Sequence, residues 1–319
     1  MRVVYMGTPA FACKPLTALH GSRHEVVAVV TGRDKRRGRG RATDPTEVCE
    51  VAHELELPVL KPKTLKSAEL YDQLAAMKPD LFVVVAFRIL PERLFTLPKH
   101  GSINLHASLL PKYRGAAPIN WALINGETET GLTSFFLKKS VDTGNMILQE
   151  KIGIDQCDNC DSLAVKMAER AGPFLLQTLD LIEQPGFKPQ VQKDQLATPA
   201  PKLTPEGAMI DFGFPAARVN DFVRGLSSRP GACTTFRNMK VKVLAGRVVG
   251  TTVTENVRPG SVLPDKKRLL IQCASSVIEI TSLVPEGKRE MDGRSFINGF
   301  KPEQGELFGV VTQGAREEI

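Results

Sequence analysis

Residues 81–87 read LFVVVAF, an apolar run with no polar position that could face water. Apolar segments at 3–6, 25–31 and 58–60 precede it, and helical patterns at 11–20, 45–55 and 68–77 lie between them. Apolar runs that alternate with helices are typical of a parallel sheet covered on both faces. The first two-thirds of the chain is therefore predicted to be α/β, a Rossmann-like open and mostly parallel sheet. Further strands are expected at 102–106, 133–137 and 146–151.

Polar residues at two helix starts suggest caps. Asp44 stands before Pro45 and is expected to cap the helix at 45–55. Asp161 and Ser162 are expected to cap a long helix that reaches about residue 182, because apolar residues recur at helical spacing beyond them.

The pattern changes beyond residue 184. Five prolines lie between residues 185 and 205, and the polar stretch 189–203 has no lasting periodicity, which indicates an extended linker. A short helix at 215–226 then precedes brief strands at 234–236, 240–244, 269–273 and 277–283. Short strands separated by glycine and proline turns predict a small β-barrel, OB-like, or a sandwich. We expect a first domain at 1–188, a linker at 189–207 and a second domain at 208–319.

Three side chains stand out for their chemistry. Asn104 and His106 lie two positions apart in a predicted strand, so both leave the same face. Asp142 is followed by Thr143 and Gly144, in a loop that could bring its carboxylate alongside. An amide can hold a developing oxyanion, an imidazole can move a proton, and a carboxylate can orient the imidazole. Each residue alone could serve only the fold, but together they predict transfer of an acyl group to an amine.

The net charge of +7 favours a polyanionic partner. Residues 33–41, RDKRRGRGR, hold six basic side chains and follow a predicted strand, at the sheet edge where ligands bind. Arginine suits phosphate and base-edge contacts, although a solvated loop without a partner is the alternative. Candidate nucleic-acid contacts are four arginines of this loop and four lysines of the basic second domain, any of which could be plain surface: Arg36, Arg37, Arg39, Arg41, Lys240, Lys242, Lys266 and Lys267.

Other features limit the functions to be considered. Cys157 and Cys160 have the spacing of half a zinc site but no further ligand nearby, so a turn is favoured over a redox pair or metal site, and no metal is predicted. Pro9 after Gly7 lacks an N–H, and the phosphate-binding glycine spacing is absent, which argues against a nucleotide site there. No apolar run approaches ~20 residues and no signal peptide is evident, so a cytoplasmic location without membrane contact is expected.

Several motifs together resemble the 10-formyltetrahydrofolate-dependent formyltransferases. They are VYMGTPAFA at 4–12, VVVAFRILP at 83–91, INLHASLLPKYRGAAPI at 103–119, DTGNMI at 142–147 and PKLTPEGAMIDF at 201–212. The resemblance spans essentially the whole chain and implies that Asn104, His106 and Asp142 are catalytic. It also implies that the folate lies against two segments whose residues are Phe87, Ile89, Leu90, Ser108, Leu109, Leu110 and Pro111. Arg88 departs from the pattern, since many members have glycine there.

The resemblance further implies a reaction. A formyl group would pass from the co-substrate 10-formyltetrahydrofolate to the α-amine of methionyl-initiator-tRNA, for translation initiation, with the second domain binding the tRNA and the protein acting as a monomer. The basic loop and the GAAP sequence at 115–118 favour this acceptor. The alternative is a nucleotide-linked amino sugar. Pro9 speaks against a glycinamide ribonucleotide, and the intact trio speaks against a non-catalytic RNA-binding protein.

Overall fold

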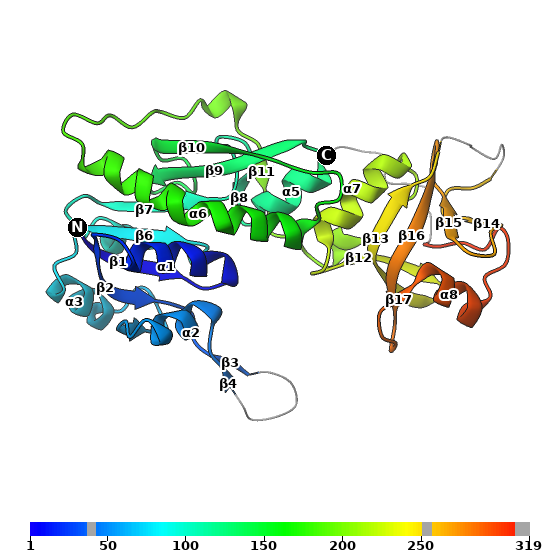
Figure 1. Ribbon diagram of the computed structural model, residues 1–319, viewed down its shortest axis with the longest axis horizontal. Helices are drawn as coiled ribbons and strands as arrows, with labels where there is room; N and C mark the ends of the chain where they lie inside the picture. The colour runs from blue at the N-terminus through cyan, green and yellow to red at the C-terminus, as the bar shows by residue number, and fades with distance from the viewer. Residues whose placement is uncertain (37–42, 251–256, 310–319) are drawn as a thin grey trace. The chain divides into compact units, whose positions relative to one another are not determined.

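The structure is a computed structural model that describes residues 1–36, 43–250 and 257–309. The chain forms two compact units (Figure 1). The first unit comprises Met1–Pro118, Glu129–Ile154 and Leu163–Pro201, and the second comprises Ile119–Thr128, Asp155–Ser162 and Lys202–Ile319. Two short segments that precede residue 163 therefore belong to the second unit. None of the helices in the described residues combines the length and the apolar character needed to cross a bilayer.

The first unit is built on one twisted sheet in the order β10-β9-β7-β6-β1-β2-β5. Its strands β1, β2, β5, β6 and β7 run parallel to one another, whereas β9 is antiparallel to both of its neighbours, β7 and β10. The predicted mostly parallel sheet is thus confirmed. The strand bounds are β1 Arg2–Gly7, β2 Glu25–Val30, β5 Val59–Leu60, β6 Leu81–Val85, β7 Ser102–His106, β9 Glu129–Phe136 and β10 Met146–Gly153.

Helices cover both faces of this sheet. Val4 and Met6 of β1 pack in a cluster with residues of α3 and α4, whereas the hydroxyl of Tyr5 donates to the carbonyl of Ala12 at 2.6 Å, beside α1. Successive residues of a strand face opposite sides, so these helices lie on opposite faces. On the α1 side, a Cβ at Gly172 of α6 would stand 2.9 Å from the Cβ of Ala18. The bounds are α1 Cys13–His20, α2 Glu47–Glu54, α3 Ala68–Ala76, α4 Glu92–Phe95, α5 Pro118–Ile124 and α6 Cys160–Glu183.

The predicted caps of both helices are wrong by two or three residues. Helix α2 begins at Glu47, and Thr46 is its cap because its hydroxyl accepts a hydrogen bond from the backbone N–H of Cys49 at 3.2 Å. Helix α6 begins at Cys160, so the predicted caps lie inside its first turn. The side chain of Asn159 accepts from the N–H of Ser162 at 2.9 Å. In both cases another polar residue, two positions from the nearest predicted one, binds a free N–H group of the first turn.

The segment after α6 is tied to the first unit along much of its length. The backbones of Gln190 and Met146 exchange hydrogen bonds of 2.7 and 2.8 Å. Strand β11 (Pro199–Ala200) pairs in parallel with β8 (Arg114–Gly115). A Cβ at Gly115 would stand 2.4 Å from the carbonyl oxygen of Ala200, so this close pairing requires glycine. Part of the predicted linker therefore pairs with segments of the first unit that follow β7 in the sequence.

The second unit contains a curled antiparallel sheet in the order β12-β13-β16-β15-β14, with β17 beside β16. The predicted small β-domain is confirmed as a half-barrel. The segment Leu307–Phe308 pairs with Ser261 and Phe236, next to the two edge strands of the sheet. The bounds are α7 Ala216–Leu226, β12 Ala232–Phe236, β13 Met239–Val248, β14 Val262–Leu263, β15 Leu269–Gln272, β16 Val277–Pro285, β17 Met291–Asp292 and α8 Gly293–Phe300.

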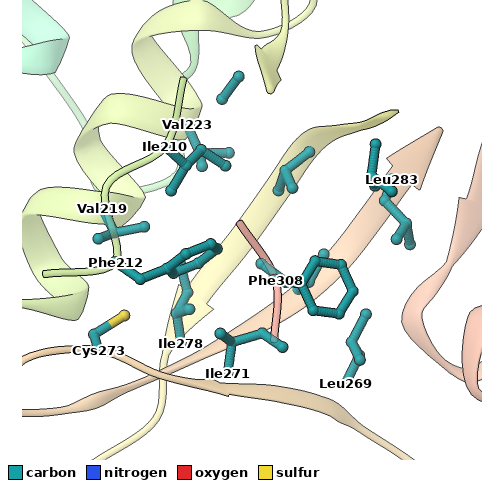
Figure 2. Packing of buried hydrophobic residues seen from close by; sticks show 14 of the residues in the cluster. Ile210, Phe212, Val219, Val223, Leu269, Ile271, Cys273, Ile278, Leu283 and Phe308 are labelled. Atoms are coloured by element: carbon teal, nitrogen blue, oxygen red, sulfur yellow. The ribbon is translucent and has the colours of Figure 1, made fainter. Parts of the chain in front are cut away.

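The core of the second unit is filled by aromatic and branched side chains. Figure 2 shows Val219 and Val223 of α7 above Phe212, Ile278 and Phe308. The ring of Phe308 stacks on that of Phe236 with centroids 4.8 Å apart, and the ring of Phe296 meets Phe236 edge-on. All of these side chains are buried. Helix α7 thus closes one side of the half-barrel by apolar contact, which is the main source of stability for such a domain.

Candidate active site

His106 is the last residue of β7, at the carboxyl edge of the parallel sheet. Its side chain is 7% exposed, and its ring lies edge-on to Phe135 of the neighbouring strand β9. The Nε2 atom lies 2.8 Å from the carbonyl oxygen of Tyr113. A carbonyl oxygen only accepts hydrogen bonds, so Nε2 carries the hydrogen and Nδ1 of the neutral ring has a free lone pair. Nδ1 is therefore the nitrogen that can take up a proton.

Asp142 lies on the Nδ1 side of this ring. Its Oδ2 atom is 3.9 Å from Nδ1 of His106 and accepts a hydrogen bond of 2.9 Å from the backbone N–H of Gly115. The distance to Nδ1 is too long for a hydrogen bond but suits attraction to a protonated imidazole. Asp142 has a positive φ of 55°, and a Cβ at Gly144 would overlap the carbonyl of Phe136. The loop is therefore held in a tight conformation that presents the carboxylate.

Asn104 occupies the same face of β7 as His106, as the alternation of strand side chains predicts. It is half-buried, between Val84 of β6 and Phe135 of β9 in the sheet register. Within the described chain, its side-chain amide has no hydrogen-bonding partner. The amide donors are therefore available to a ligand at the sheet edge. The structure thus brings together the three residues that the sequence singled out.

Thr133 is a buried residue that sequence reasoning missed. Its hydroxyl donates to the carbonyl of Ser108 at 2.6 Å and accepts from the N–H of Leu110 and from Nε2 of Gln149. These bonds anchor the turn that follows His106 to strand β9. A hydroxyl side chain among the buried residues of β9 is the sequence signal for this role, because a buried hydroxyl must find partners.

The residues expected to contact folate follow two neighbouring parallel strands. Residues 86–91 come after β6 and residues 107–111 after β7, so both segments leave the same edge of the sheet as His106. Ile89 is 76% exposed, whereas Leu90, Ser108 and Leu110 are buried. Phe87 is half-buried, and the guanidinium of Arg88 lies 5.2 Å from its ring centroid. Phe87, Ile89, Leu109 and Pro111 are thus the members of the set with accessible surface.

Five of the eight basic residues predicted to contact nucleic acid lie in the described part of the chain. Lys240 and Lys242 are exposed on β13, where they alternate with the buried Val241 and Val243. Lys266 and Lys267 are exposed in the turn before β15. Arg36 belongs to β3 (Lys35–Arg36), which pairs with β4 (Thr43–Asp44) in a small hairpin. Three further candidates lie outside the described residues: Arg37, Arg39 and Arg41.

Cys157 and Cys160 do not form a disulfide. The side chain of Asn120 donates to Sγ of Cys160 at 3.1 Å. Burial raises the pKa of the Cys160 thiol to about 12, so this group is a neutral thiol at physiological pH. Redox-active and zinc-binding cysteines act as thiolates, which this environment disfavours. Cys157 lies in the turn before α6 and Cys160 is the first residue of that helix, which agrees with the turn that the spacing favoured.

Comparison with known proteins identifies the family of the chain. The family model described as formyl transferase matches residues 1–179, and that described as the formyl transferase C-terminal domain matches residues 202–301. The methionyl-tRNA formyltransferase of Caldanaerobacter subterraneus subsp. tengcongensis is 41% identical over 309 residues, which cover 96% of this chain and 99% of that protein.

Two solved structures share the fold at low sequence identity. HypX from Aquifex aeolicus, in complex with tetrahydrofolic acid, has a TM-score of 0.64 and 18% identity, over 99% of this chain and 50% of that one. WlaRD, a sugar 3N-formyl transferase solved in the presence of dTDP and 5-N-formyl-THF, has a TM-score of 0.65 and 15% identity, over 91% of this chain and 99% of that one. Similarity at this level concerns the fold alone.

Proposed function

The chain belongs to the formyl transferase family, and from that premise we propose that it formylates the α-amine of methionyl-initiator-tRNA with 10-formyltetrahydrofolate as co-substrate. The observation that supports this acceptor is the 41% identity, over nearly the full length of both chains, to a methionyl-tRNA formyltransferase. The product is N-formylmethionyl-tRNA, which serves translation initiation. As part of the same proposal, the enzyme acts as a cytoplasmic monomer.

A nucleotide-linked amino sugar is the alternative acceptor. The structural likeness to WlaRD supports it only at the level of the fold, since 15% of residues are identical. Paired assays decide between the two acceptors. The two assays measure formylation of charged initiator tRNA and of a sugar nucleotide at equal enzyme concentration. We expect that only the tRNA is formylated. Formylation of only the sugar nucleotide contradicts the proposed acceptor.

In the proposed mechanism, Asn104 acts on the formyl oxygen. Attack by the neutral α-amine forms a carbon–nitrogen bond and places negative charge on that oxygen. The half-buried Asn104 amide has donors free to stabilise this charge, and its place on a strand fixes it before the reaction begins. Pre-oriented donors of this kind contribute about 10²–10³ in rate.

His106 moves the proton. Its Nε2 hydrogen is engaged with the Tyr113 carbonyl, so Nδ1 accepts the proton that the attacking amine loses. The carboxylate of Asp142, 3.9 Å away, then faces a positive imidazolium and stabilises it. The proton passes to the leaving nitrogen as the old carbon–nitrogen bond breaks, which restores the neutral ring. The α-amine has a pKa of about 8, so a useful fraction is already neutral and no stronger base is required.

The folate supplies the formyl carbon from the edge where β6 and β7 end. The exposed Ile89 and the accessible faces of Phe87 and Leu109 offer apolar contact beside Asn104 and His106. The side chains of Leu90, Ser108 and Leu110 are buried, and in our proposal they support the two segments that contact the folate. In our proposal the reacting side chains lie in residues 1–188, residues 189–207 connect the two domains, and residues 208–319 bind the tRNA.

Removal of two charges from β13 tests the proposed tRNA surface. The double variant Lys240→Ala, Lys242→Ala is expected to weaken tRNA binding several-fold, because each lysine that contacts a phosphate releases counterions. The slope of log affinity against log salt concentration should fall by roughly one for each lysine lost. Lys14→Ala, Lys151→Ala removes the same charge from exposed positions of the first unit and is the control. Equal weakening by both pairs contradicts a specific role for β13.

The arginine-rich segment is proposed to act on the acceptor end of the tRNA. Its flanks form the β3–β4 hairpin of the first unit, which follows β2 of the proposed catalytic sheet. Arg39→Ala or Arg41→Ala is expected to lower the rate on initiator tRNA more than it weakens binding, since binding energy is used to position the amine. The variants should also narrow the preference for initiator over elongator methionyl-tRNA. Lys266→Ala is the control and should affect both tRNAs alike.

A further inference from the structure

Gln192 lies in the segment after α6, far in sequence from the proposed catalytic residues, yet it is only 6% exposed. Its side-chain oxygen accepts two hydrogen bonds from Arg114, from Nε at 3.1 Å and from Nη2 at 2.7 Å. Its side-chain nitrogen donates to the backbone carbonyls of Asp142 at 2.9 Å and Gly144 at 2.8 Å. Both amide hydrogens and both oxygen lone pairs are thus used.

These four bonds join the two chain segments that hold the Asp142 carboxylate. One is the loop that carries Asp142, where Gln192 binds two carbonyls on either side of Thr143. The other is β8, where Arg114 precedes Gly115, and the N–H of Gly115 donates to Oδ2 of Asp142. One amide side chain therefore helps to set the position of that carboxylate relative to Nδ1 of His106.

The segment around Gln192 has attachments of its own. The Gln190 backbone pairs with Met146, and the hydroxyl of Thr198 accepts from the N–H of Tyr113 at 2.9 Å. Strand β11 pairs with β8. These contacts keep the segment in place without the Gln192 side chain. The amide is therefore not needed to attach the chain, and its bonds act on the Asp142 loop.

We propose that Gln192 is a positioning residue for formyl transfer, which fixes the Asp142 carboxylate at the distance from His106 that stabilises the imidazolium. The inference rests on the proposed function. Its physical basis is that a displacement of about 1 Å in a catalytic group can cost 10²-fold in rate. Arg114 strengthens the effect, because its charge polarises the amide and so its donation to the two carbonyls.

Gln192→Glu isolates the donated bonds. The glutamate keeps the acceptor for Arg114 but loses both N–H donors, and it places an oxygen against the carbonyls of Asp142 and Gly144. We expect the single-turnover rate at saturating substrates to fall about 10- to 100-fold, with KM for tRNA and folate changed less than about threefold. Asp194→Asn is the matched control, because Asp194 also binds Arg114 at 2.6 Å but is exposed. It should react at the rate of the unchanged protein.

A double-mutant cycle with Asp142→Ala separates positioning from a structural role. If Gln192 acts through Asp142, Gln192→Glu lowers the rate less than about threefold once Asp142 is absent. The same loss in both backgrounds, or a full rate for Gln192→Glu alone, overturns the proposal. Gln192→Met has similar size and neither donor nor acceptor, and it replaces the glutamate in the cycle if that variant fails to fold.

Hydrogen exchange gives a readout that needs no substrate. The N–H of Gly115 is protected by its hydrogen bond to Oδ2 of Asp142. Its exchange rate should rise at least about tenfold in Gln192→Glu and should stay unchanged in Asp194→Asn. Unchanged exchange in Gln192→Glu overturns the positioning role. An unchanged protein that fails to formylate methionyl-tRNA contradicts the proposed function instead, and the exchange experiment still decides the role of Gln192.

Discussion

Replacement of His106 by alanine is expected to lower the single-turnover rate of formyl transfer by at least about 10²-fold, and Asn104→Ala by about 10²–10³-fold. In the proposed mechanism, the first variant loses the nitrogen that takes the proton from the attacking amine, and the second loses the donor to the developing oxyanion. Asp142→Ala should also remove most activity, because no charge then faces the protonated ring. The measurement is quenched-flow formylation of charged initiator tRNA, with folding checked by circular dichroism.

His100→Ala is the matched control for this experiment. His100 is an exposed histidine just before the opposite end of β7, so its loss removes the same chemistry from a place remote from the sheet edge. Its rate should equal that of the unchanged protein. Double variants within the trio should lose less than the product of the single losses, since in the proposed mechanism all three residues serve one tetrahedral intermediate. A folded His106→Ala protein with a near-normal rate contradicts the assignment.

Phe308→Ala is expected to destabilise the second unit by about 3–5 kcal/mol, the range for deletion of a buried aromatic ring. Phe308 is fully buried, stacks on Phe236, and belongs to the segment that pairs beside both edges of the half-barrel. The variant therefore leaves a cavity where the sheet is closed. Urea unfolding followed by tryptophan fluorescence measures the loss, because Trp121 is the single tryptophan of the chain and belongs to this unit.

Phe214→Ala is the control for the cavity. Phe214 lies in the same unit and loses the same atoms on substitution, but it is 39% exposed and its ring carries the guanidinium of Arg218 at 4.2 Å. A cation–π contact at such a site is worth about 0.5–1 kcal/mol, so the expected loss is small. Comparable losses for the two variants would show that Phe308 does not close the half-barrel.

The elements predicted best from the sequence are those whose buried side chains form a regular pattern along the chain, either continuous or periodic. Strand β6 is buried at every position, and its continuous apolar run marked the centre of a parallel sheet. Asn104 and His106 were found for a related reason, since a spacing of two places side chains on one face of a strand. The caps were misplaced because more than one polar residue near the start of a helix can cap it, and only the folded backbone decides which one accepts the bond.

The residues that sequence reasoning missed act over long separations. Gln192 reaches Arg114 across 78 positions, and Thr133 reaches Ser108 across 25. Neither residue belongs to a periodic pattern or to a spacing that indicates its partner. Strands β8 and β11 have two residues each and exist only because they pair with one another. Contacts of this kind are set by tertiary structure, which local preference does not encode.

The discontinuous make-up of the second unit limits how this protein can be recombined with its relatives. The side chain of Asn120 donates to the carbonyl of Gly225 at 2.8 Å, and a Cβ at Gly225 would stand 2.7 Å from a side-chain carbon of Ile124. A chimera joined in the proline-rich segment would exchange Gly225 and leave Asn120 and Ile124 behind. Exchange of the second unit between formyltransferases therefore requires residues 119–128 and 155–162 to be transferred together with the part that begins at Lys202.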